Sequence, residues 1–275
     1  MKYSRLYEKT NYLLNIPYLS SIYITEYDLS KANISSLKYM GYLSDNDYNW
    51  LYNVDKMTRE IYIGNLERSN NEVSKIKKQG ILEARKQLFF ENNLQDNEIL
   101  SIKNDAVFII GDRPIKNKFE HFTFNKKNVY TFFMTTTSRL EIYYMYDKIS
   151  NLEVIDVKGI NDKVLSKHEN YMITFLCEIF YMIQNNTIED VLSYYNDFYE
   201  KFINLELDPG YYREFNPASV YRIDSNRQSF GFEYIDSSYL KRNDSGISLI
   251  NLDCNILLLR DLYGVISDIY FRTKR

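Results

Sequence analysis

The stretch EILSIKNDAVFII, residues 98–110, contains two apolar runs separated by a short polar segment. Ile99–Ile102 and Val107–Ile110 have the β-branched and aromatic composition of strands, and Asn104-Asp105 between them is typical of a tight turn. The pattern predicts an antiparallel hairpin that carries Asp105 at its tip. A carboxylate in that place is able to bind a metal ion, although an Asn-Asp turn often serves only to cap the local backbone.

A second aspartate occupies a comparable place upstream. Residues 18–27, YLSSIYITEY, have the alternation of a strand, and Asp28 follows directly. The next segment, LSKANISSLKYMG at residues 29–41, has apolar positions near helical spacing and ends in glycine. A strand that ends in an aspartate before a helix can hold a metal ion beside helix-start amides that accept phosphate. The alternative is that Asp28 only caps the helix.

The segment from Ser44 to Asn92 is predicted to be helical throughout. In its last part, one helix face is apolar and consists of Val73, Ile76, Ile81, Ala84 and Leu88. The other face is basic, which predicts a solvated surface made of Lys75, Lys77, Lys78, Arg85 and Lys86.

Strand-like segments return after residue 125 and helices follow them. The predicted strands lie in residues 126–136, 139–150 and 152–160, and the predicted helices in residues 161–184 and 187–207. The remaining chain, from residue 208, suggests short polar strands and a closing helix at residues 252–271. This order of elements predicts an α+β fold.

Length and composition predict a folded protein with a substantial core, since the chain has 275 residues of which 45% are hydrophobic. With a net charge of -3, binding to a nucleic acid would need a local basic patch. Cys177 and Cys254 lack metal-ligand spacing, which favours a reducing compartment. No apolar run reaches the roughly 18 residues of a membrane helix, so we expect a soluble, cytoplasmic protein.

Motifs of several common enzyme classes are absent from the sequence. The chain contains no Gly-rich phosphate loop, GxSxG, HExxH or paired CxxC, which argues against Walker ATPases, serine hydrolases and zinc enzymes. His121 and His168 are the only histidines, so the sequence gives little support for catalysis by histidine side chains. The carboxylates and lysines that remain favour metal-assisted phosphoryl chemistry.

The order of these elements resembles the polymerase core of family B DNA polymerases, with palm, fingers and thumb and without the exonuclease domain. EYDLSKANISSL, residues 26–37, resembles the family motif that carries a metal-binding aspartate, which implies that role for Asp28. Asn33 then stands where the family has the tyrosine that screens the sugar 2′ position. The same stretch is as similar to the DxSxxE pattern of family A polymerases.

Two further motifs follow in the family's order. KMTREIYIG, residues 56–64, resembles the fingers motif, which implies that Lys56, with Arg59, contacts the triphosphate of the incoming nucleotide. The hairpin at residues 98–110 is similar to the YxDTDS hairpin, and Asp105 matches its second, catalytic aspartate. Lys103 stands where the family has the first aspartate.

The resemblance extends to the strands that follow the hairpin. Residues 126–130, KKNVY, resemble the KKxY element that holds the primer end, and residues 156–159, DVKG, resemble the family's KG element. The implied site is catalytic and metal-binding at Asp28 and Asp105, nucleotide-binding at Lys56, Arg59 and Asn33, and nucleic-acid-binding at Lys126, Lys127, Tyr130 and Lys158.

The resemblance covers residues 20–185 and implies both a fold and an activity. It implies an antiparallel-sheet palm at residues 1–42 and 93–160, a helical fingers-like insertion at residues 43–92, and a thumb-like region at residues 161–275. The implied activity is DNA polymerase-like nucleotidyl transfer with two Mg²⁺ or Mn²⁺ ions, on a DNA or RNA primer–template with nucleoside triphosphates. Separate protein subunits would supply missing domains. A divergent, phage- or mobile-element-like polymerase is expected, in the host cytoplasm if it is phage-encoded.

Two other functions stay open. Lys103 in place of an aspartate favours a palm-like accessory subunit that has lost catalysis and still binds nucleic acid. The abundance of tyrosine suits a structural or assembly protein with a partner-binding surface. A metal titration distinguishes the first of these from an enzyme, and salt-dependent binding to nucleic acid distinguishes the second.

Overall fold

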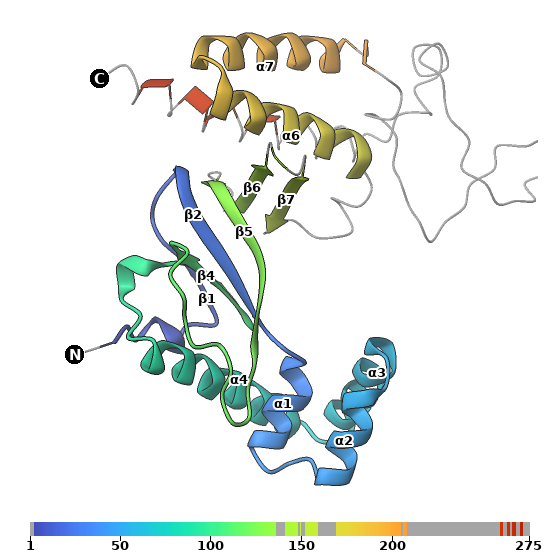
Figure 1. Ribbon diagram of the computed structural model, residues 1–275. Helices are drawn as coiled ribbons and strands as arrows, with labels where there is room; N and C mark the ends of the chain where they lie inside the picture. The colour runs from blue at the N-terminus through green and yellow to red at the C-terminus, as the bar shows by residue number, and fades with distance from the viewer. Residues whose placement is uncertain are drawn as a thin grey trace, which may run out of the picture. The chain divides into compact units, whose positions relative to one another are not determined.

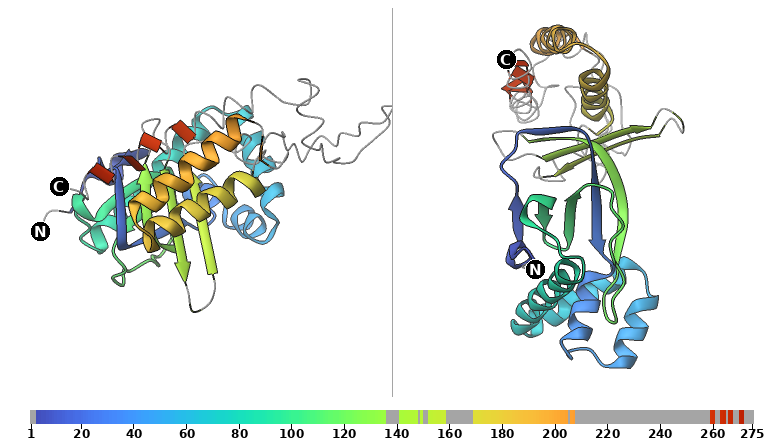
Figure 2. Two further views of the ribbon diagram at one scale, coloured as in Figure 1. Left: turned by 90° about the horizontal axis from the view of Figure 1, so that it is seen from above. Right: turned by 60° about the vertical axis from the view of Figure 1, so that its left-hand side comes forward.

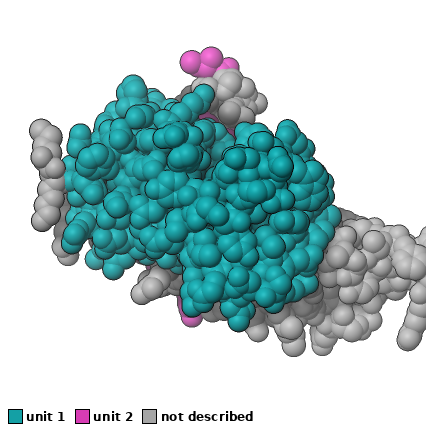
Figure 3. Space-filling model, turned by 90° about the horizontal axis from the view of Figure 1, so that it is seen from below, with its two compact units in different colours: residues 1–15, 22–130 teal, residues 16–21, 131–275 magenta. Residues whose placement is uncertain are grey.

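The computed structural model of the protein describes residues 3–135, 141–147, 149, 152–158, 169–204, 206–207, 259–260, 263–264, 266–267 and 270–271. Its strands form a seven-stranded sheet in the hydrogen-bonding order β1-β3-β4-β2-β5-β6-β7. Together with the helices, this sheet confirms the predicted α+β fold. The chain forms two compact units, Met1–Asn15 with Ile22–Tyr130 and Ile16–Ser21 with Thr131–Arg275 (Figure 3).

The hairpin predicted from the sequence is present in the first unit, where two further strands flank it (Figure 1). Asn104 at its turn has a left-handed φ of 53°, which asparagine tolerates better than most residues. The strands in chain order are β1 (Asn11–Leu13), β2 (Tyr18–Leu29), β3 (Ile99–Lys103) and β4 (Ala106–Ile110). The predictions of the hairpin and of the strand that leads to Asp28 are therefore confirmed.

Helices fill most of the chain between β2 and β3. Ser44 and Asp55 cap two of them, because their side chains accept hydrogen bonds from the backbone N–H of Asp47 (3.1 Å) and Thr58 (3.0 Å). The helices are α1 (Ala32–Tyr39), α2 (Asp45–Asn53), α3 (Lys56–Ser69) and α4 (Glu72–Glu91), with short 3₁₀ turns at Leu6–Glu8 and Asp96–Glu98. The helical prediction for residues 44–92 is confirmed.

Helices α1 and α4 approach each other closely at Gly80. A Cβ atom at this position would lie 2.6 Å from Ser36 Cβ, so only glycine fits there. On the apolar face of α4, Val73, Ile81, Ala84 and Leu88 are buried and Ile76 is partly buried, as the periodicity predicts. The prediction of a solvated basic face is wrong for Arg85, which is 3% exposed and donates a hydrogen bond to the carbonyl oxygen of Lys9.

The second unit combines the end of the sheet with two long helices that pack against each other (Figure 2). Phe175 and Phe198 stack with ring centroids 3.8 Å apart, and they belong to an aromatic core that includes Phe132, Tyr144 and Phe180. The elements are β5 (Phe124–Thr135), β6 (Glu141–Asp147), β7 (Leu152–Lys158), α6 (Glu169–Asn185) and α7 (Ile188–Ile203). β5 begins in the first unit.

Several predictions fall outside the described residues. They are the short strands expected after residue 208, the first part of the helix expected from residue 161, His168 and Cys254. Within the closing helix expected at residues 252–271, Leu259 and Ile266 are helical and fully buried. Across the described ranges, no helix combines the length and the apolar character needed to cross a bilayer.

Candidate functional site

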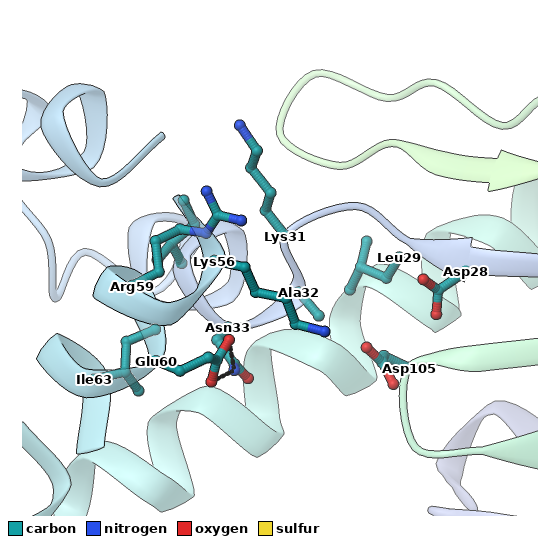
Figure 4. Close-up of a pocket in the computed structure, with 11 residues that line it drawn as sticks. Asp28, Leu29, Lys31, Ala32, Asn33, Lys56, Arg59, Glu60, Ile63 and Asp105 are labelled. Carbon is teal, nitrogen blue, oxygen red and sulfur yellow. Dashed lines mark hydrogen bonds between the residues drawn. The ribbon is translucent and has the colours of Figure 1, made fainter. Parts of the chain in front are cut away.

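A pocket of about 190 Å³ in the first unit lies between the end of β2, the hairpin tip, the start of α1 and the face of α3 (Figure 4). The carboxylates of Asp28 and Asp105 stand next to each other at one side of this pocket, and basic side chains stand at the other side. The lining residues are Asp28, Leu29, Lys31, Ala32, Asn33, Ile34, Lys56, Arg59, Glu60, Ile63 and Asp105.

Strand pairing explains why the two aspartates meet. β2 and β4 are antiparallel neighbours, and their register sets Asp28 opposite Ala106, the residue after Asp105. The backbone N–H of Leu29 donates to the carbonyl oxygen of Asp105 at 3.1 Å, which fixes the two strand ends together. The structure therefore brings together the two carboxylates named from the sequence. Their role as metal ligands stays a prediction.

The Asp105 carboxylate is the less compensated of the two. Burial raises the pKa of Asp105, the charge of Asp28 raises it further, and Lys127 and Arg85 act in the opposite direction. Within the described chain, the Asp105 side chain makes no ion pair. The Asp28 Oδ2 atom, by contrast, lies 2.9 Å from Lys127 Nζ. A half-buried carboxylate that faces a pocket without a paired cation is well suited to bind a positively charged ligand.

The structure tests whether Asp28 caps the helix that follows it. Helix α1 has Lys31 as its N-cap residue, with a left-handed φ of 47°, and the Lys31 side chain makes no capping hydrogen bond. The alternative in which Asp28 caps the helix is therefore wrong. The side chain of Asp28 faces the pocket and Lys127 instead.

Three basic residues line the other side of the pocket. The Lys31 ammonium lies 3.1 Å from the centroid of the Tyr52 ring, and burial together with the charge of Arg59 lowers the pKa of Lys31. Arg59 donates to the carbonyl oxygen of Val54 at 2.5 Å. Lys56 points its amino group toward Asp105 (Figure 4) and makes no hydrogen bond or ion pair within the described chain. It is therefore available for a ligand.

Asn33 and Glu60 connect α1 with α3 inside the pocket. Asn33 Nδ2 donates to Glu60 Oε1 at 3.2 Å and to Glu60 Oε2 at 3.0 Å, and both side chains face the pocket (Figure 4). This contact holds the helix that carries Lys56 and Arg59 beside the strand end that carries Asp28.

The residues predicted to bind a nucleic-acid strand lie in different environments. Lys127 pairs with Asp28, and Lys126 pairs with Asp112 at 2.5 Å outside the pocket. Tyr130 is fully buried and donates to Glu26 Oε2 at 3.0 Å, so direct contact between Tyr130 and a nucleic acid is excluded in this structure. The prediction that Tyr130 binds a nucleic-acid strand is therefore wrong, and the Tyr130 side chain belongs to the interior of the protein. Lys158 belongs to the second unit, where Asp156 Oδ2 lies 2.6 Å from its Nζ.

Sequence reasoning missed Lys31, Glu60 and Arg85. Burial lowers the pKa of Arg85 to about 10, and the charge of Asp105 works against this shift, so the buried guanidinium lies close enough to act on the pocket. The spacing of Arg85 contains the signal, since it is four residues after Ile81 and three before Leu88 on the buried face. For Lys31, the signal is its place in the link between strand and helix.

Comparison with known proteins places the chain within one family. The family model described as Bacteriophage PBS1 gene 130 protein matches residues 1–258. This match agrees with the predicted phage origin, and the description names no activity. No curated protein matches the chain. The description of the family therefore leaves the function to be argued from the site.

Proposed function

We propose that this chain, which belongs to the bacteriophage PBS1 gene 130 protein family, is a template-directed, DNA polymerase-like nucleotidyltransferase. It would work by two-metal phosphoryl transfer. The observation that supports this proposal is the shared pocket in which Asp28 and Asp105 face Lys31, Lys56 and Arg59. Carboxylates on one side and cations on the other are the groups that a metal-bound nucleoside triphosphate requires.

The donor set of the acidic side fits Mg²⁺ or Mn²⁺. These ions prefer carboxylate oxygens and retain several water ligands, so two protein carboxylates suffice when the substrate phosphates contribute the remaining ligands. Within the described residues no cluster of three or more His, Cys, Asp or Glu side chains is present that could hold a metal ion. Asp28 and Asp105 would hold the ions, which supply activation of a primer hydroxyl and neutralisation of the departing pyrophosphate.

The chain's own residues bind and orient the reactants. Lys56 has an amino group without a partner in the described chain, and it would bind the triphosphate together with Lys31 and Arg59. Lys126 and Lys127 lie on β5, outside the pocket lining, and would bind the backbone of a DNA or RNA primer–template without reading its sequence. These contacts would bring the primer end and the nucleotide together, which is a large part of catalysis in phosphoryl transfer.

The test is primer extension with labelled nucleotides in Mg²⁺ or Mn²⁺. Asp28→Asn and Asp105→Asn are each expected to lower the extension rate by at least about a hundredfold, because either change removes a charged ligand of the ions. The matched control is Asp112→Asn, which removes a carboxylate that pairs with Lys126 outside the pocket and should retain most of the activity. Extension by both pocket variants at the wild-type rate would contradict the proposal.

A second function is favoured by two lysines. Lys103 stands where the resemblance expects an aspartate, and Lys127 neutralises Asp28. Both features suit a nucleic-acid-binding accessory subunit without catalysis. Titration calorimetry distinguishes it from the enzyme: absent Mg²⁺ and Mn²⁺ binding, with salt-dependent DNA binding retained, would select the accessory subunit. A protein that binds neither would instead support an assembly role.

A further inference from the structure

We infer that the Glu60–Asn33 pair is a sugar-binding element and that the preferred substrate of the pocket is a ribonucleoside triphosphate. This inference rests on the proposed function, because it assumes that the pocket binds a nucleotide. It adds a specificity-determining residue, Glu60, whose carboxylate would accept a hydrogen bond from a ribose hydroxyl.

The position of Glu60 makes it a direct neighbour of the phosphate-binding residues. Glu60 is four residues after Lys56 on α3, so the two side chains lie on the same helix face, and both line the pocket. A ligand that reaches the Lys56 amino group therefore also comes within reach of the Glu60 carboxylate.

The Glu60 carboxylate retains the capacity to bind a ligand. An ionised carboxylate has about four lone-pair sites on its two oxygens. Asn33 Nδ2 donates to each oxygen once, at 3.2 and 3.0 Å, which leaves further lone pairs for a donor in the pocket. Because the amide holds the carboxylate in place, a donor that arrives there meets an oriented acceptor.

Charge determines which part of a nucleotide Glu60 can bind. A carboxylate beside a phosphate group is repelled by it, so Glu60 would weaken binding if a phosphate lay against it. A hydroxyl group is a hydrogen-bond donor and matches the carboxylate, as acidic residues match the ribose 2′-hydroxyl in dinucleotide-binding folds. A ribose offers two adjacent hydroxyls to the carboxylate and a 2′-deoxyribose only one, so the ribonucleotide is the better match. The sugar, placed next to the phosphates in a nucleotide, is the part that fits.

The size of the pocket is consistent with this assignment. Its volume of about 190 Å³ is below the range of pockets that enclose a whole drug-sized ligand, so only part of a nucleotide is enclosed. With phosphates at the lysines and the sugar at Glu60, the base would remain outside the pocket, where a template strand could pair with it.

The experiment measures the dissociation constants of ATP and 2′-deoxy-ATP for the full chain in Mn²⁺, without primer, by titration calorimetry. The wild-type chain is expected to bind ATP about tenfold or more tightly than 2′-deoxy-ATP, the difference that one hydrogen bond to a charged group supplies. In Glu60→Gln this ratio should fall severalfold. The control Glu67→Gln, on the same helix and paired with Lys77 outside the pocket, should keep the wild-type ratio.

The outcomes separate the inference from the function on which it rests. Equal or tighter binding of 2′-deoxy-ATP by the wild-type chain overturns the inference alone, whether or not the Glu60→Gln protein folds. An unchanged ratio in folded Glu60→Gln assigns the discrimination elsewhere and overturns the role of Glu60. Absence of any nucleotide binding overturns the proposed function together with the inference.

Discussion

The Lys127 ammonium places a positive charge beside the Asp28 carboxylate, on the acidic side of the pocket. Its Nζ lies 2.9 Å from Asp28 Oδ2. Burial lowers the pKa of Lys127, but the hydrogen bond and charge of Asp28, with the charges of Glu26 and Asp105, outweigh this effect and raise it. The ammonium therefore remains protonated and occupies a place that a metal ion at Asp28 would need.

Removal of this lysine should strengthen metal binding. Lys127→Met is expected to raise the affinity for Mn²⁺ by about three- to tenfold, a modest factor because the ion pair is partly exposed to solvent. Lys126→Met is the matched control, since its pair with Asp112 lies outside the pocket. Titration calorimetry without nucleic acid measures both. Weaker Mn²⁺ binding by Lys127→Met would show that the lysine supports the metal site instead of competing with it.

At the scale of elements, the close approach of α1 and α4 depends on one glycine. A Cβ at Gly80 would lie 2.8 Å from both Cα and the carbonyl oxygen of Ser36, and backbone atoms cannot move aside cheaply. Gly80→Ala should therefore lower the free energy of unfolding by about 1–3 kcal/mol, despite the better helix propensity of alanine.

Gly64 on α3 provides the control for this prediction. A Cβ there would meet nothing within 4 Å, so Gly64→Ala should raise the free energy of unfolding by up to about 1 kcal/mol. Urea denaturation of both variants measures the difference. If Gly80→Ala were as stable as Gly64→Ala, the two helices would have to lie further apart than they do here.

The elements could be predicted from the sequence because their signals are local. The hairpin at residues 98–110 and the helices within residues 44–92 depend on residues within a few positions of each other. The burial of Tyr130 could not be predicted in this way, because its hydroxyl binds Glu26, which is 104 residues away in the chain. Pairing between strands that are far apart in the sequence determines which side chains are buried beside the site.

At the scale of the whole molecule, buried and partly buried tyrosines make stability depend on pH. Burial raises the pKa of Tyr12 in the first unit and of Tyr144 and Tyr195 in the second. The unfolded chain loses these protons near pH 10 while the folded chain keeps them, so the folded state binds more protons above that pH. Stability is therefore fully present below pH 10 and falls as the pH rises further.

The free energy of unfolding should be nearly constant between pH 8 and 9 and decline above pH 10, by about 1.4 kcal/mol per pH unit for each tyrosine that ionises only when unfolded. Arg85 and Lys31 oppose the decline, because burial lowers the pKa of both, that of Arg85 to about 10, but they are two groups against several tyrosines. Urea denaturation across this range measures the slope. Tyr195→Phe should have a shallower slope, and an identical slope would contradict the assignment.

The two units are also interleaved along the chain. Residues 16–21 of the second unit interrupt the sequence of the first, and β5 starts in one unit and finishes in the other. Truncation at residue 130 would divide β5. It would also leave residues 16–21, which belong to the second unit, in a chain that contains only the first. Neither unit is one contiguous stretch of the chain, so no single contiguous gene fragment encodes one unit without part of the other.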